Sequence, residues 1–169
     1  QPLVRQLSVP NAAVRSAAIG ALSRQGEKAV AALIPLLEGT ATTARSEAAE
    51  ALAALGTTAV PSLVEVLRQA PPEGIRSESV VEGAADALTR IGGPAAVALV
   101  PLYAEAGPVT RRRIVNILRD IGADAVDRLG AIIVNHEHPN SGTAAGLVGE
   151  LPNVGPAAAG CLIGGLSDP

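Results

Sequence analysis

The stretch VNHEHPNSG, residues 134–142, contains both histidines of this 169-residue chain. His136 and His138 flank Glu137, and imidazole and carboxylate groups are common ligands of zinc. A designed metal site needs three or four converging ligands with supporting hydrogen bonds, and the sequence offers no further histidine or cysteine nearby. The next residues, 139–142, are of turn-forming types. We therefore expect a polar turn between helices here and no metal site.

The single cysteine, Cys161, is the other residue type that could perform chemistry. A lone cysteine without a neighbouring histidine is usually a small core residue. One cysteine also excludes an internal disulfide, which fits a reducing compartment. We expect no catalytic residue, no cofactor and no enzymatic activity, and a cytoplasmic location is favoured over secretion.

Composition narrows the classes of partner. Hydrophobic residues make up 48% of the chain, yet it has one tyrosine and no phenylalanine, tryptophan or methionine. The net charge is -3, so no overall basic field favours nucleic acid, and the aromatic residues that stack on single strands are missing. Charge, glycine or proline interrupts each apolar stretch before the roughly 18 residues that a membrane span requires. A protein partner is the remaining expectation.

An internal repeat defines the elements that would position functional residues. Five segments end at a glycine that follows a leucine by four residues. The glycines are Gly26, Gly56, Gly92, Gly122 and Gly155, and the leucines are Leu22, Leu52, Leu88, Leu118 and Leu151. Further apolar residues recur at helical spacing before each glycine. The pattern predicts a helix in each segment, ended by a glycine in the left-handed conformation.

A second apolar segment follows each glycine and predicts a partner helix. Prolines lie in three of these segments, at Pro35, Pro61 and Pro101, and we expect them to act as tolerated kinks. The fold class is then all-α, an α-solenoid of about five helical hairpins in a single repeat domain over residues 1–169. The expected units are approximately 1–26, 27–56, 57–92, 93–122 and 123–155, with a partial unit at 156–169.

The repeat resembles the HEAT-like repeat family, in the short form found in the phycobilisome-lyase group. The resemblance is carried by PNAAVRSAAIGALSRQG, where Val14 and Arg15 match the family's Val-Arg opening of the second helix, and by the closing LIGGLSDP. It implies a non-catalytic protein-binding or scaffold module. Both ends fall within a repeat, so we expect a fragment of a longer protein, of bacterial type.

Two known enzymes share this architecture, and each has functional residues whose positions can be checked in this sequence. Deoxyhypusine hydroxylase, which the chain resembles in its helix pairing, has iron-binding His-Glu pairs directly after the Val-Arg position. The corresponding pairs here are Ser16-Ala17, Ser46-Glu47, Glu82-Gly83, Arg112-Arg113 and Ala145-Gly146. The HEAT-like alkylpurine DNA glycosylase relies on aromatic residues and a basic groove, and both are missing. Neither activity is expected.

The resemblance implies that the second helices line a concave surface that binds a partner. The outward positions in the middle of the chain are acidic and then basic. The expected partner-binding residues are Glu47, Glu50, Glu82, Asp86, Arg112, Arg113, Asn116 and Arg119. An alternative is that Glu82 and Asp86 pair with the arginines of the next second helix. The sequence leaves both uses open.

Two further interpretations follow from the same resemblance. Arg45 and Arg111 precede these outward positions and are expected to be structural, bonding neighbouring loops. Glu150 occupies a repeat position that is apolar in the other units, and we expect its side chain to turn to solvent.

The alternative function is a subunit similar to bilin lyases or isomerases, which would handle a tetrapyrrole on a partner protein. A shift in bilin absorption on mixing would identify it.

Overall fold

The computed structural model describes residues 17–18, 20–22, 24–38, 42–70, 75–135 and 137–151. Every regular element in these ranges is a helix, and they contain no strand. Residues 1–91 and 92–169 form two compact units. The all-α fold class predicted from the repeat is therefore confirmed.

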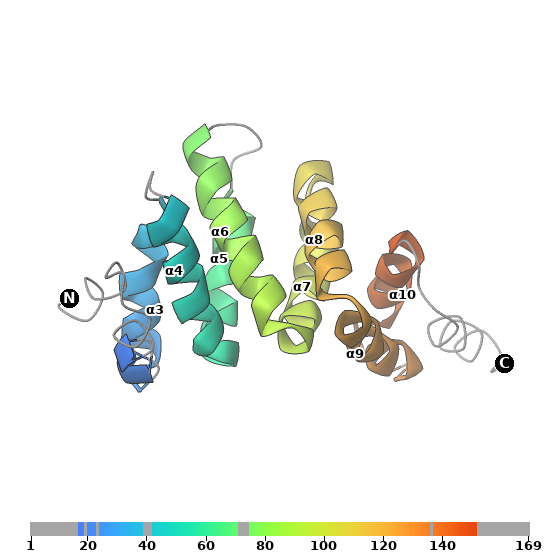
Figure 1. Ribbon diagram of the computed structural model, residues 1–169. Helices are drawn as coiled ribbons and strands as arrows, with labels where there is room; N and C mark the ends of the chain where they lie inside the picture. The colour runs from blue at the N-terminus through green and yellow to red at the C-terminus, as the bar shows by residue number, and fades with distance from the viewer. Residues whose placement is uncertain are drawn as a thin grey trace, which may run out of the picture. The chain divides into compact units, whose positions relative to one another are not determined.

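The first unit consists of helical hairpins that share one core. Its named elements are α3 (Glu27–Leu33), η2 (Ile34–Glu38), α4 (Thr42–Ala54), η3 (Gly56–Thr58), α5 (Val60–Gln69) and α6 (Ile75–Ile91). The two second helices, α4 and α6, pack side by side (Figure 1). Both also contact η2, and α5 packs against α6. Successive hairpins thus cover one another, as expected of stacked repeats.

The second unit continues the same alternation of first and second helices. Its elements are α7 (Gly93–Glu105), α8 (Pro108–Ile121), α9 (Ala123–Val134) and α10 (Ser141–Glu150). The helix α9 packs against both α7 and α10, and α7 packs against α8 (Figure 1). The Asp124 carboxylate at the start of α9 accepts a hydrogen bond of 2.5 Å from the Gly93 amide, which ties the two first helices together.

The periodic leucines form the centre of the core. Leu52, Leu88 and Leu118 have no exposed surface, and Leu22 is 2% exposed. No polar or charged residue is buried in the described part of the chain. Aliphatic residues alone therefore fill this core, in agreement with the prediction from the repeat. Because the side chains are small, the helices can approach closely, and burial of apolar surface stabilises the stack.

Three repeat glycines, Gly26, Gly92 and Gly122, have the positive φ that the sequence predicts, but not the expected conformation. At Gly92, φ is 79° and ψ is -137°, and at Gly122 the angles are 77° and -134°. These values lie near the mirror image of extended backbone, so the prediction of a left-handed helical cap is wrong in ψ. Only glycine adopts this region readily. This backbone conformation reverses the chain direction, so the first helix of the next unit begins directly after the glycine. Gly155 lies outside the described residues.

The three prolines of the first helices have three different outcomes. Pro35 lies in η2, where the α-helical pattern of α3 has already changed to a tighter helix. Pro61 lies in the first turn of α5, where its missing N–H has no helical partner in any case. Pro101 lies within α7, which continues to Glu105. The prediction of a kink is thus wrong for Pro61, because the helix begins later than the apolar pattern.

Within the described residues, an apolar length sufficient for a bilayer occurs at most in one bent pair of helices. Among the described residues, no single helix has both the length and the apolar character to cross a bilayer. The segments Thr43–Ala54 and Gly56–Gln69 pass a test of length and composition together, with a bend of 110° between them.

Candidate functional site

The predicted partner-binding residues divide between the two units. Glu47, Glu50, Glu82 and Asp86 lie on α4 and α6 of the first unit, and Arg112, Arg113, Asn116 and Arg119 lie on α8 of the second. All eight avoid the core: five are exposed, and three are half-buried. The half-buried residues are Glu47, Asp86 and Arg113. The helices α4 and α6 pack side by side, and Glu82 and Asp86 line a pocket together with residues of α4.

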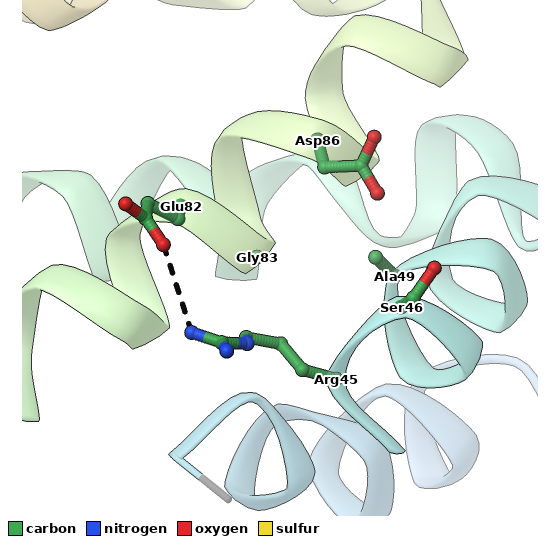
Figure 2. Close-up of a pocket in the computed structure, with 6 residues that line it drawn as sticks. All are labelled: Arg45, Ser46, Ala49, Glu82, Gly83 and Asp86. Atoms are coloured by element: carbon green, nitrogen blue, oxygen red, sulfur yellow. Dashed lines mark ion pairs between the residues drawn. The ribbon is translucent and has the colours of Figure 1, made fainter. Parts of the chain in front are cut away.

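A pocket of about 200 Å³ lies between these two helices. It is lined by Arg45, Ser46, Ala49, Glu82, Gly83 and Asp86 (Figure 2). The Arg45 side chain extends from α4 toward α6 and pairs with Glu82, with 3.6 Å between Arg45 Nη1 and Glu82 Oε2 (Figure 2). The Glu82 side chain is 70% exposed, whereas that of Arg45 is only 17% exposed. A charged group entering from solvent therefore meets the Glu82 carboxylate before the arginine.

Gly83 makes room for this arrangement. A Cβ atom at residue 83 would lie 2.9 Å from Leu37 Cδ2 and 3.2 Å from Arg45 Cγ. The missing side chain lets α6 approach closely, so that the aliphatic stem of Arg45 packs between the helices. Arg45 was expected to be structural and was not expected at a binding surface. It lines the pocket together with Ala49, because residues four apart lie on one face of a helix.

Two carboxylates of α6, those of Glu82 and Asp86, form ion pairs within the first unit. Asp86 Oδ1 lies 3.0 Å from Arg90 Nε one helical turn further along α6. Glu82 pairs with Arg45 on α4. Such exposed pairs contribute about 0–1 kcal/mol to stability. They leave Glu82 and Asp86 accessible while reducing their net negative field.

A second cluster of polar side chains joins α7, α8 and α10. The Tyr103 hydroxyl donates a hydrogen bond to the Glu150 carboxylate, and this bond raises the pKa of Tyr103, with burial and the charge of Glu150 acting in the same direction. The Arg111 guanidinium donates to the carbonyl oxygens of Tyr103 and Ala104 at 3.1 Å each. It also lies 5.1 Å from the centre of the Tyr103 ring. This cluster holds helix ends together.

The expectations for Arg111 and Glu150 have separate outcomes. Arg111 has the structural role that was predicted, because it binds carbonyl oxygens at the end of α7. Glu150 is exposed, as expected, but it is also the hydrogen-bond acceptor of Tyr103. No local sequence pattern indicates that contact, since the two residues are 47 positions apart.

In the loop between α9 and α10, His138 has a local structural role. Its Nδ1 accepts a hydrogen bond of 3.2 Å from the Asn140 amide, and its own amide donates to the Asn135 carbonyl oxygen at 2.8 Å. His136 and Cys161 lie outside the described residues. Within the described ranges, no three side chains of metal-ligating type lie together. Absence of a metal site at His136 and His138 stays a prediction.

The first unit therefore has a pocket whose lining includes charged and hydroxyl groups. Its lining provides one guanidinium group, two carboxylates and one hydroxyl, set on rigid helices above an aliphatic core. These groups can bind charged or polar side chains by hydrogen bonds and ion pairs. None of the six lining residues is histidine or cysteine, the usual general base and thiol nucleophile.

Comparison with known proteins agrees with this architecture. No curated protein matches the chain. HEAT repeats generally mediate protein–protein interaction or scaffolding, and proteins built from them are typically non-catalytic. Residues 1–81 match the family model described as HEAT repeats, and this match, with the helical hairpins of the fold, supports a HEAT-like repeat family for the chain.

Proposed function

We propose that this chain is a non-catalytic protein-binding or scaffold module, and that it binds its partner through the outward side chains of the second helices. The observation that carries the proposal is the pocket between α4 and α6. It is open to charged groups, it lies on two consecutive second helices, and Glu82 and Asp86 of the predicted surface line it. HEAT-like repeats supply the expectation of a protein partner.

The rigidity of the surface supports binding without catalysis. The pocket is supported by α4 and α6, whose inward residues Ala48, Leu52, Ala84 and Leu88 are fully buried. A backbone already held in packed helices loses little further conformational entropy when a partner binds. The narrower similarity to the phycobilisome-lyase group, and the tetrapyrrole function that it implies, rest on the sequence resemblance alone.

Site-specific photo-crosslinking tests the proposal. A photoreactive amino acid is placed at Ser46, an exposed residue of the pocket on α4, and in a matched protein at Ser62, an exposed residue of the first helix α5. Cells producing each protein are irradiated, and the adducts are identified by mass spectrometry. We expect one recurring protein partner crosslinked from Ser46 and not from Ser62.

Two results would contradict this proposal. Adducts formed from Ser62 but not from Ser46 would place the partner on the first helices. A scan of exposed positions along α4, α6 and α8 that yields no protein adduct would argue against a protein-binding module on these helices.

A further inference from the structure

The helix α8 presents a face of arginine side chains. Arg112, Asn116 and Arg119 follow one another at intervals of four and three residues, which places them on one side of an α-helix. All three are exposed, and Arg113, which is half-buried, borders the same side. We call Arg112, Arg113 and Arg119 the α8 arginines. At a rise of 1.5 Å per residue, they extend over roughly 10 Å.

The α8 arginines have no acidic partner, whereas most other arginines of the described residues are engaged. Arg45, Arg68, Arg90 and Arg128 each lie within 3.0–3.7 Å of a carboxylate oxygen. Arg111 is engaged by the carbonyl oxygens at the end of α7. In the described part of the chain, the guanidinium groups of the α8 arginines form neither an ion pair nor a hydrogen bond. Three positive charges thus lie on one helix without an ion-pair partner in the described ranges, and Asp120 is the single acidic residue of that helix.

Arg113 adds a second observation. Its Nη1 atom is buried and has no hydrogen-bond acceptor among the described residues. A buried donor that belongs to a charged group and has no acceptor destabilises the folded state. Partial removal from water also strengthens any ion pair that the remaining guanidinium nitrogens form. Arg113 is therefore the position at which an incoming carboxylate would gain most.

The rest of the molecule indicates the class of partner. The net charge of -3 and the single aromatic residue disfavour a nucleic acid, which needs a broad basic surface. A second copy of this chain is a weaker match, because Glu82 and Asp86 of its second helices already form ion pairs with Arg45 and Arg90, and self-association is one outcome of the test. A short segment rich in aspartate and glutamate has the complementary charge, and arginine binds carboxylates in a two-pronged geometry.

We propose that the α8 arginines bind an acidic segment of the partner protein. The inference rests on the proposed function and names the chemistry of its partner. Binding by such a face accelerates association and weakens with added salt. Because the three charges lie on one rigid helix, the segment would contact them along roughly two helical turns.

The test measures binding of a defined probe by the full chain. Fluorescence anisotropy follows a labelled glutamate-rich peptide, its glutamine counterpart and a labelled single-stranded oligonucleotide. The test variant carries Arg112→Gln, Arg113→Gln and Arg119→Gln. The control carries Arg68→Gln, Arg90→Gln and Arg128→Gln, which changes the net charge equally. Circular dichroism verifies that both variants fold, and a variant with lysine at the three α8 positions retains the charge.

We expect the glutamate-rich peptide to bind the wild-type chain more tightly than the other two probes. The test variant should bind it about tenfold more weakly, because three ion pairs of about 0.5 kcal/mol each correspond to that factor. The control should remain within about twofold, and the lysine variant should recover part of the affinity.

Several outcomes would overturn the inference. One is absence of peptide binding, and another is an equal loss in the control variant, which would indicate diffuse electrostatics. Preferential binding of the oligonucleotide would indicate a nucleic acid partner. Self-association abolished by the test variant would indicate a second copy. Crosslinks from Ser46 that persist while the peptide fails to bind would retain the proposed function and remove only this inference.

Discussion

Tyr103 is the only aromatic residue of the chain, and its environment can be measured directly. The hydrogen bond to Glu150 raises its pKa above the ordinary value of 10.0. The folded state thus favours the neutral phenol, so this contact stabilises the protein below pH 10 and is lost as the pH rises through the raised pKa. An alkaline titration followed by tyrosinate absorbance should give an apparent pKa above that of free tyrosine.

The variant Glu150→Ala tests the cause of this shift. It removes both the acceptor and the negative charge, so the pKa of Tyr103 should fall toward its ordinary value, and Arg111 then acts to lower it. Glu137→Ala is the control, since that carboxylate is not among the groups that act on Tyr103. An unchanged titration in Glu150→Ala would show that the hydrogen bond does not form in solution.

Leu118 is a residue whose contribution to stability is large and predictable. It is fully buried at the centre of the second unit. Leu118→Ala should lower the free energy of unfolding by roughly 2–5 kcal/mol, because it removes apolar contacts and leaves a cavity. Denaturant unfolding followed by circular dichroism measures this change.

Val134→Ala provides the matched comparison for Leu118. Val134 is 60% exposed at the end of α9. Its truncation should change the free energy of unfolding by no more than about 0.5 kcal/mol. Equal effects of the two substitutions would mean that the core of the second unit does not contain Leu118 as described.

At the scale of the helical element, two glycines at equivalent repeat positions should respond in opposite ways. Gly83 in α6 and Gly146 in α10 each lie nine residues before a repeat glycine. Alanine favours a helix over glycine by about 1 kcal/mol. A Cβ at residue 146 meets nothing within 4 Å, so Gly146→Ala should raise the free energy of unfolding by up to that amount.

Gly83→Ala should bring the same gain in helix propensity, but its new Cβ would also clash with a neighbouring side chain. The new Cβ would lie 2.9 Å from the fully buried Leu37. Overpacking of a core costs about 1–3 kcal/mol, which offsets or exceeds the gain in helix propensity. Denaturant midpoints of the two variants should therefore differ, with Gly83→Ala the lower. A stabilisation of both would show that η2 and α6 separate without cost.

At the scale of the whole molecule, stability should be local. Repeat proteins are stabilised by each repeat and its nearest neighbours, and this chain forms two compact units. Leu118→Ala should therefore increase amide hydrogen exchange more in residues 92–151 than in residues 17–91. Mass spectrometry of exchanged peptides resolves the two ranges. An equal increase in both would mean that the chain unfolds as a single cooperative unit.

Sequence alone determined the helices and the composition of the core. The leucine that precedes each repeat glycine predicts which face of a second helix is buried, and Leu52, Leu88 and Leu118 confirm it. Helical periodicity is a property of residues close together in the chain, so it can be recognised without knowledge of the fold. The requirement for positive φ at Gly92 and Gly122 was likewise predictable, because the residue type itself indicates it.

Only the tertiary structure decided which charged groups meet. The pairing of Arg45 with Glu82, the contact of Tyr103 with Glu150 and the packing against Gly83 each join different helices. Such contacts depend on the distance between helix axes and on side-chain rotamers, to within a few tenths of an ångström. A linear pattern of charges contains neither quantity. The sequence thus predicted a polar surface on the second helices. Tertiary packing determined which charged groups on that surface form ion pairs. The carboxylates Glu82 and Asp86 of α6 pair with arginines of the same unit, whereas the α8 arginines have no ion-pair partner among the described residues.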